Sequence, residues 1–126
     1  MFSLSIISSI IPNLINENEC EQINNGIWDY FEHITQNWSG DFSPIKKNDN
    51  KTWNNIFHLY PLHAQLFKHW SVGQSQVCWD TRQNSKIVNV FSQLWNCTPE
   101  ELLVSFDGFS FCLPPETTNK GWQNKT

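Results

Sequence analysis

Apolar side chains in the first third of the chain recur every three or four positions. The residues that share this spacing are Cys20, Ile23, Ile27, Phe31 and Ile34. A helix places such positions on one face, so the pattern predicts an amphipathic helix over residues 17–36. Asn16 precedes this helix and Glu19 follows three positions later, which is the arrangement of a capping box at a helix start.

The middle of the chain repeats the helical pattern in shorter pieces. Residues 51–70 predict short helices interrupted at Pro61, and another helical piece is expected to begin near Gly73 and to run through residues 74–83. The succession of Thr98, Pro99 and two glutamates is typical of a helix start. Residues 85–95 predict a further amphipathic helix, and its expected buried face consists of Ile87, Val90, Phe91, Leu94 and Trp95.

Two stretches favour extended backbone over helix. Residues 4–11 are apolar and end before Pro12, and residues 102–112 combine β-branched with aromatic side chains. Gly108 in the second stretch indicates a bulge or the close approach of another backbone. Helices together with a few strands predict an α+β fold that is mostly helical.

The overall composition limits the classes of function. A chain of 126 residues with a net charge of −4 is expected to form one domain, and it offers no basic field for nucleic acid. The first eleven residues are too short to span a bilayer and lack a basic start and a cleavage site. The cysteines form no Cys-x-x-Cys pair, so we expect reduced thiols packed like small apolar residues. We therefore expect a cytoplasmic protein that binds neither membrane nor nucleic acid.

The sequence contains no complete set of catalytic residues. The four histidines are His33, His58, His63 and His69, and none is followed two positions later by Asp or Glu. A non-haem iron site typically uses such a pair together with a distant histidine. Nucleophile-elbow, phosphate-loop and dinucleotide-binding motifs are also absent. We therefore predict no metal ligand and no catalytic residue in this chain, and we expect packing or surface roles for the histidines.

Two polar groups differ from their surroundings. Arg82 is the one arginine of the chain, and its guanidinium can hold two acceptors in a geometry that lysine cannot copy. It is expected to clamp an internal aspartate or an acidic ligand, with the internal clamp favoured. Asp107 interrupts an apolar stretch, so it is predicted either to cap nearby amides or to point into a pocket. Ser105 would share its face, two positions earlier.

Five short motifs follow one another along the chain. They are WDTRQ at 79–83, VFSQLW at 90–95, LLVSFDG at 102–108, PPE at 114–116 and GW at 121–122. In this order they resemble the phytanoyl-CoA dioxygenase-like family of iron(II)- and 2-oxoglutarate-dependent oxygenases. The resemblance implies N-terminal helices packed on the sheet of a double-stranded β-helix, or jelly roll. It also implies Ser105, Asp107 and Trp122 in or beside the pocket, and Arg82 and Gln83 in the helical support of that pocket.

Complete members of that family hold iron(II) and 2-oxoglutarate, and their His-x-Asp pair comes shortly after the PPE and GW motifs. This sequence contains no such pair. The resemblance therefore implies a single truncated domain over residues 1–126, with an incomplete jelly roll and no activity alone. Two alternatives stay open: half of a split dioxygenase completed by a second polypeptide, and a small non-catalytic binding or structural protein. An incomplete sheet would expose strand edges to a partner or to self-association.

Overall fold

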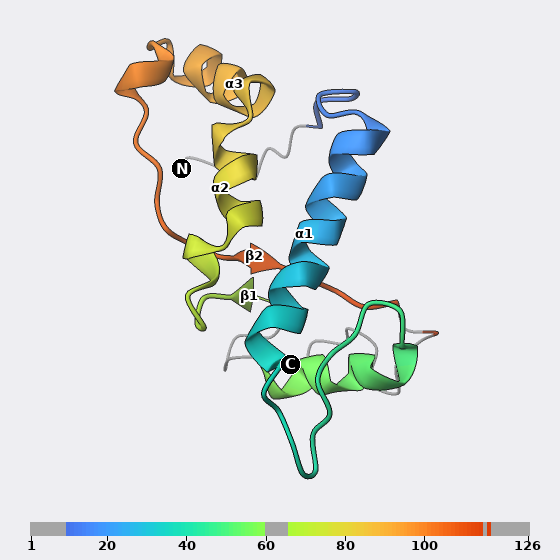
Figure 1. Ribbon diagram of the computed structural model, residues 1–126. Coiled ribbons are helices and arrows are strands. Elements are labelled where there is room, and N and C mark those ends of the chain that lie inside the picture. The colour runs from blue at the N-terminus through green and yellow to red at the C-terminus, as the bar shows by residue number, and fades with distance from the viewer. Residues whose placement is uncertain (1–9, 60–65, 115, 117–126) are drawn as a thin grey trace, which may run out of the picture.

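The fold of the chain is α+β, and its described part has five shorter helical segments and a strand pair arranged around one long helix (Figure 1). The computed structural model describes residues 10–59, 66–114 and 116. The α-helices are α1 (Glu17–Thr35), α2 (Gln76–Gln83) and α3 (Ser85–Trp95), the 3-10 helices are η1 (Asn50–His58), η2 (Val72–Gln74) and η3 (Pro99–Glu101), and the strands are β1 (Leu66–Phe67) and β2 (Phe109–Ser110). Within the described residues, no helix combines the length and the apolar character needed to cross a bilayer.

Helix α1 begins where the capping pattern predicts. The Asn16 side chain accepts a hydrogen bond from the Glu19 backbone N–H at 2.8 Å, and the Glu19 carboxylate accepts one from the Asn16 N–H at 2.7 Å. Two of the backbone donors at the helix start are thereby satisfied. The helix start predicted at Thr98 is likewise confirmed: the Thr98 N–H donates a hydrogen bond to the Glu101 carboxylate at 2.7 Å, and η3 begins at Pro99.

The core is built around Phe31 of α1, which is fully buried. Its ring centroid lies 5.1 Å from that of Phe67, 5.9 Å from that of Phe109 and 5.1 Å from that of Phe111. Edge-to-face packing of this kind adds to the free energy gained by burying the rings. Ile45 joins the same cluster from the loop after α1. The core therefore lies between α1, the strand pair and the segments that follow α1.

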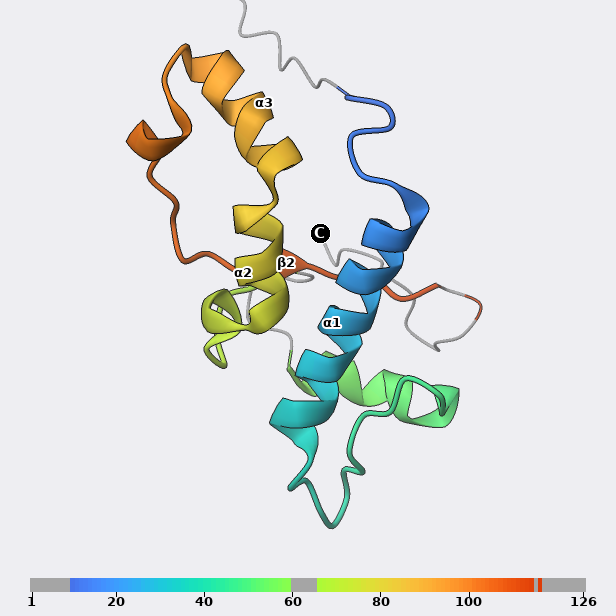
Figure 2. The same cartoon turned by 45° about the horizontal axis from the view of Figure 1, so that its top comes forward.

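The strand pair is antiparallel, with Leu66 opposite Ser110 and Phe67 opposite Phe109. Gly108 lies directly against the backbone carbonyl of Phe67, so close that a Cβ atom could not be accommodated there. Of the two roles that the sequence predicts for Gly108, a bulge or a close approach of another backbone, the structure shows the close approach. Both views place the pair beside the middle of α1 (Figures 1 and 2).

Helix α2 packs against α1 through another glycine. A Cβ atom at Gly26 would lie 2.8 Å from the Cβ of Val77, so the missing side chain lets the two helices approach closely. Asn84 separates α2 from α3, and its side chain accepts hydrogen bonds from the backbone N–H groups of Lys86 and Ile87. The chain thus starts a new helix immediately after α2, in a different direction (Figure 2).

The predicted bounds of α3 are correct, but its predicted buried face is wrong. No residue of α3 is buried, and the side chains of Leu94 and Trp95 are each 69% exposed. The reason is its position: α3 projects past the end of α2, away from the core around Phe31 (Figure 1). The apolar stripe of α3 is therefore not covered by any of the described residues.

Three other predictions about local structure need correction. The strand predicted over residues 102–112 is confined to β2, because only this part finds a hydrogen-bonded partner, in β1. Leu66 and Phe67 form a strand where a helix was predicted, because pairing with β2 outweighs the local helical pattern. Cys20 and Cys112 are exposed, not packed inside, although the four cysteines are free as expected. Residues 4–9 of the strand predicted over 4–11 lie outside the described residues, and Ile10 and Ile11 have no regular structure. Pro61, the predicted interruption of the short helices, also lies outside the described residues.

Candidate functional site

Arg82, near the C-terminal end of α2, joins two segments that are distant in sequence. Its Nη1 donates a hydrogen bond to the carbonyl oxygen of Gly73 at 2.5 Å, and its Nη2 donates one to the carbonyl oxygen of Asp107. The guanidinium also lies over the rings of Trp79 and Phe106, at 5.8 and 5.9 Å from their centroids. Arg82 therefore clamps the chain internally, with backbone carbonyls as acceptors in place of the expected aspartate carboxylate.

The backbone around this clamp is closely packed. Gly73 is buried, and a side chain there would collide with the carbonyl of Phe106. The ring of Phe106 meets that of Trp79 edge-on at 5.6 Å. Together these contacts fix the segment before β2 against the start and the face of α2. Arg82 also lines a small hollow of about 210 Å³ together with Gly108.

Ser105 and Asp107 come together at the surface. The Ser105 hydroxyl donates a hydrogen bond to the Asp107 carboxylate at 2.9 Å, and both residues are exposed. Gln83 is exposed at the end of α2. Trp122, the third predicted pocket residue, lies outside the described residues. The pocket roles of Ser105, Asp107 and Trp122 remain predictions.

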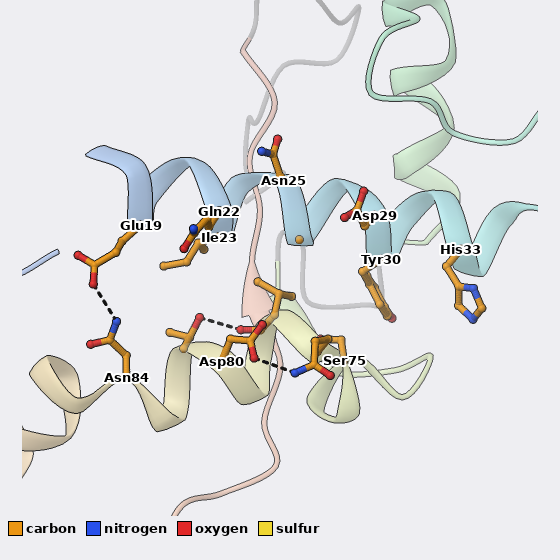
Figure 3. A pocket seen from close by; sticks show the side chains of 14 residues that line it. Glu19, Gln22, Ile23, Asn25, Asp29, Tyr30, His33, Ser75, Asp80 and Asn84 are labelled. Atoms are coloured by element: carbon orange, nitrogen blue, oxygen red, sulfur yellow. Dashed lines mark hydrogen bonds between the residues drawn. The ribbon is translucent and has the colours of Figure 1, made fainter. Parts of the chain in front are cut away.

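A cavity larger than the hollow beside Arg82 lies elsewhere, in a groove between α1 and α2. It has a volume of about 670 Å³. Figure 3 shows that Glu19, Gln22, Tyr30 and His33 of α1 point toward the α2 side. The opposite wall contains Asp80 and, at the start of α2, Ser75, among other residues. We call this cavity the α1–α2 groove.

One end of the α1–α2 groove is closed by Glu19. Its carboxylate accepts hydrogen bonds from the Lys86 ammonium at 2.6 Å and from the Asn84 amide at 3.4 Å. The hydrogen bond from Lys86 is the main reason why the pKa of Glu19 lies below its ordinary value. Glu19 therefore carries its charge near neutral pH, and this charge is already balanced by a cation.

The middle of the α1–α2 groove differs from this end. The Asp80 carboxylate accepts a hydrogen bond from the Gln76 amide at 2.7 Å. Asp29 also borders the groove, but its side chain, unlike that of Tyr30, does not point toward α2 (Figure 3). Neither aspartate forms an ion pair with a lysine or arginine of the described residues. Both aspartates are exposed, so water solvates their carboxylates.

Tyr30 links the α1–α2 groove to the core. It is buried, and its hydroxyl donates a hydrogen bond to the carbonyl oxygen of Trp70 at 2.9 Å. Burial disfavours the phenolate and raises the pKa of Tyr30 to about 12. Tyr30 is therefore a neutral hydrogen-bond donor that joins α1 to the segment after β1.

Sequence reasoning missed the α1–α2 groove. Its walls come from residues about fifty positions apart, such as Asp29 and Asp80, so no local motif marks it. One available signal was Gly26 in the apolar face of the first helix, because a glycine there permits close contact with a second helix. The polar residues that border this helix contact then line the α1–α2 groove.

No group of three or more His, Cys, Asp or Glu side chains suited to a metal ion occurs within the described residues. His33 lies within 3.4 Å of the Gln36 amide, and the ring of His58 packs on that of Phe42 at 4.1 Å. Comparison of the chain with protein families, with curated proteins and with solved structures yields no match.

Proposed function

We propose that this chain forms the helical support and the first strands of an oxygenase-like jelly roll and is catalytically inactive alone. In this proposal α1 and α2 support the sheet, and β1 and β2 belong to it. Further strands would carry the iron(II) and 2-oxoglutarate sites. The motif order of the sequence is what connects this arrangement to the oxygenases.

The observation that carries the proposal is that residues 102–107 are unpaired and expose apolar side chains. This segment continues directly into β2, yet it has no strand partner among the described residues. Leu103 is 99% exposed, and Val104 and Phe106 are also exposed. Apolar side chains on an unpaired extended backbone are typical of a sheet whose next strand is missing. Arg82 holds this segment close to α2, which is what a helical support would do.

The described residues do not fit an iron site of the oxygenase type. Such a site needs two imidazoles and one carboxylate on one face. His33 and His58 come from different elements and make the contacts given above, and His69 follows β1 at the surface. We therefore assign no catalytic step to this chain, and we expect the metal ligands of the complete fold on other strands.

The decisive experiment measures iron(II) binding and 2-oxoglutarate decarboxylation by the purified chain. We expect neither stoichiometric iron nor turnover above the rate without protein. Turnover with stoichiometric iron would overturn the proposal. A matched sample with chelator distinguishes protein-bound iron from free iron in solution.

A second candidate is that another polypeptide supplies the missing strands, so that two chains form one dioxygenase. The exposed edge at residues 102–107 favours this candidate, because it can accept a strand from another chain. The test is the coding sequence downstream of this chain, read in all three frames. It should encode a His-x-Asp or His-x-Glu pair and a distant histidine, and a second polypeptide expressed from it should restore turnover. If no such pair is encoded, this candidate loses its basis.

A small non-catalytic binding or structural protein is the third possibility, and the closed core around Phe31 favours it. It predicts a monomer that unfolds cooperatively on heating without any partner. A non-cooperative melt, or aggregation at low temperature, would argue against it.

A further inference from the structure

The apolar stripe of α3 is a surface that no described residue covers. Phe91 is about half exposed, and Leu94 and Trp95 are exposed further. The helix carries one charged residue, Lys86, and its ammonium pairs with the carboxylate of Glu19 at the start of α1. Large apolar side chains gathered on one uncharged face are typical of a binding surface. The area, the charge and the position of the stripe indicate what covers it.

The area of the stripe is small for an interface between two copies of the chain. Judged from the exposed fractions of Phe91, Leu94 and Trp95, each copy would contribute roughly 400 Å² of apolar side-chain surface, or about 800 Å² for the pair. A stable interface between two proteins buries about 1,200 to 2,000 Å² in total. A segment of the same chain needs less area, because it is already tethered and loses less translational freedom on docking. The area therefore favours a cover from within the chain.

The charge of α3 disfavours a lipid surface as the cover. Helices that lie on membranes carry lysine and arginine opposite their apolar face, and α3 has neither beyond the paired Lys86. The net charge of −4 of the whole chain also opposes contact with anionic lipid. An uncharged segment of protein matches the stripe better.

The residues that precede α1 include such a segment. Phe2, Leu4 and Ile6 are separated by single serines, and an extended backbone directs alternate side chains to opposite faces. One face of this stretch is thus apolar and the other carries hydroxyl groups, which suits a segment that covers an apolar surface and faces water on its other side. Residues 1–9 lie outside the described residues, and residues 1–11 contain no charged side chain. The sequence of this segment therefore complements the stripe of α3.

The position of the segment also fits, because the start of α1 lies close to the start of α3. The Lys86 ammonium lies 2.6 Å from the Glu19 carboxylate. Both views place residues 10–16 at the same end of the molecule as α3 (Figures 1 and 2), and Ile10 is almost fully exposed. From Lys86 to Trp95 the helix rises about 14 Å, whereas the eight residues before Ile10 can span up to about 26 Å. The segment is therefore long enough to reach the exposed end of α3.

We propose that residues 2–6 dock on α3 and cover Leu94 and Trp95 with their apolar face. The serine face of the segment then points to solvent, and residues 7–16 connect it to α1. This contact is independent of the proposed oxygenase relationship, because it involves neither the Arg82 clamp nor residues 102–107. The docked segment makes this surface of α3 inaccessible to other molecules.

The test is hydrogen–deuterium exchange of the complete chain, followed by mass spectrometry of the peptides that contain α3. Loss of an apolar side chain from either side of the contact releases the segment, so Ile6→Ser and Leu94→Ala should each accelerate the exchange of α3 amides about tenfold. Alanine keeps the helix propensity of α3 high. The double variant should stay within a factor of two of either single variant, because the second substitution finds the contact already lost. Effects that multiply to about a hundredfold would mean that the two side chains act separately, and the proposal would fail.

The matched control is Ile7→Ser, which makes the same chemical change one position later, on the opposite face of an extended segment. It should leave the exchange of α3 within a factor of two of wild type. Equal acceleration by Ile6→Ser and Ile7→Ser would exclude a contact of defined orientation and overturn the proposal, as would unchanged exchange in Ile6→Ser. Protection of α3 that rises with protein concentration would identify a second copy as the cover, which also contradicts the proposal. Circular dichroism verifies that each variant keeps its fold.

Discussion

Truncation of Phe31 should destabilise the protein far more than truncation of Phe91, although both occupy apolar positions of predicted helices. Phe31 is fully buried and contacts the rings of Phe67, Phe109 and Phe111. Replacing a buried phenylalanine by alanine costs about 3 to 5 kcal/mol, because the transfer free energy is lost and a cavity remains. For a domain of this size, about 4 kcal/mol lowers the midpoint of thermal unfolding by roughly 16 °C.

Phe91→Ala is the matched control on α3. Its side chain is 49% exposed, so the same truncation should cost less than about 1 kcal/mol, and alanine regains part of that through its higher helix propensity. The assay is urea unfolding followed by tryptophan fluorescence and circular dichroism, with Phe31→Leu as an intermediate that retains most of the volume. Equal losses for Phe31→Ala and Phe91→Ala would refute the reasoning, because α3 would then pack against a surface of its own.

Three further predictions concern single contacts. Arg82→Lys should lower the free energy of unfolding by about 1 to 2 kcal/mol, because an ammonium cannot hold the Gly73 and Asp107 carbonyls in the same fork; a chemical denaturation curve unchanged from wild type would contradict this role. Thr35→Val should cost about 1 to 3 kcal/mol, because the buried Thr35 hydroxyl accepts a hydrogen bond from the Ile45 N–H at 3.0 Å; Thr35→Ser, which keeps the hydroxyl, serves as its control in the same assay. Burial raises the pKa of Tyr30 to about 12, above the value of about 10 in an unfolded chain. The neutral Tyr30 side chain therefore contributes fully to the free energy of unfolding below pH 10, and this contribution is lost as the pH rises from 10 toward 12. Urea midpoints measured from pH 9 to 11.5 should fall less steeply for Tyr30→Phe than for wild type, and parallel curves would exclude Tyr30 as the cause.

Some of the fold could be predicted because its signals are local. The capping box of Asn16 and Glu19 uses residues three positions apart, and it starts α1 as expected. The boundary between α2 and α3 is likewise a local feature. The Asn84 side chain caps α3 by accepting hydrogen bonds from backbone N–H groups two and three positions later. Such contacts need no knowledge of the tertiary structure, so the sequence alone suffices to place them.

The remainder depends on partners that are distant in sequence. Leu103 belongs to an apolar stretch, but whether such a stretch becomes a strand depends on a neighbour, and β1 reaches only Phe109 and Ser110. The predicted buried face of α3 is wrong for the same reason, because periodicity identifies an apolar face but not the surface that covers it. For the candidate site, the importance of Arg82 was predictable from its chemistry. Its carbonyl acceptors, and the groove formed by Asp29 and Asp80, required the packing of α2 on α1.

The pairing of β1 with β2 also bears on when the protein can fold during its synthesis. The ring cluster around Phe31 includes Phe67 from β1, Phe109 from β2 and Leu113 beyond it. At translation rates of about 5 to 20 residues per second, Leu113 follows Phe67 by roughly 2 to 9 s. Throughout that interval Ile45, Ile56 and Phe67 can already cover part of the apolar face of α1, whereas the part of Phe31 that Phe109 and Phe111 contact stays uncovered until these residues emerge from the ribosome.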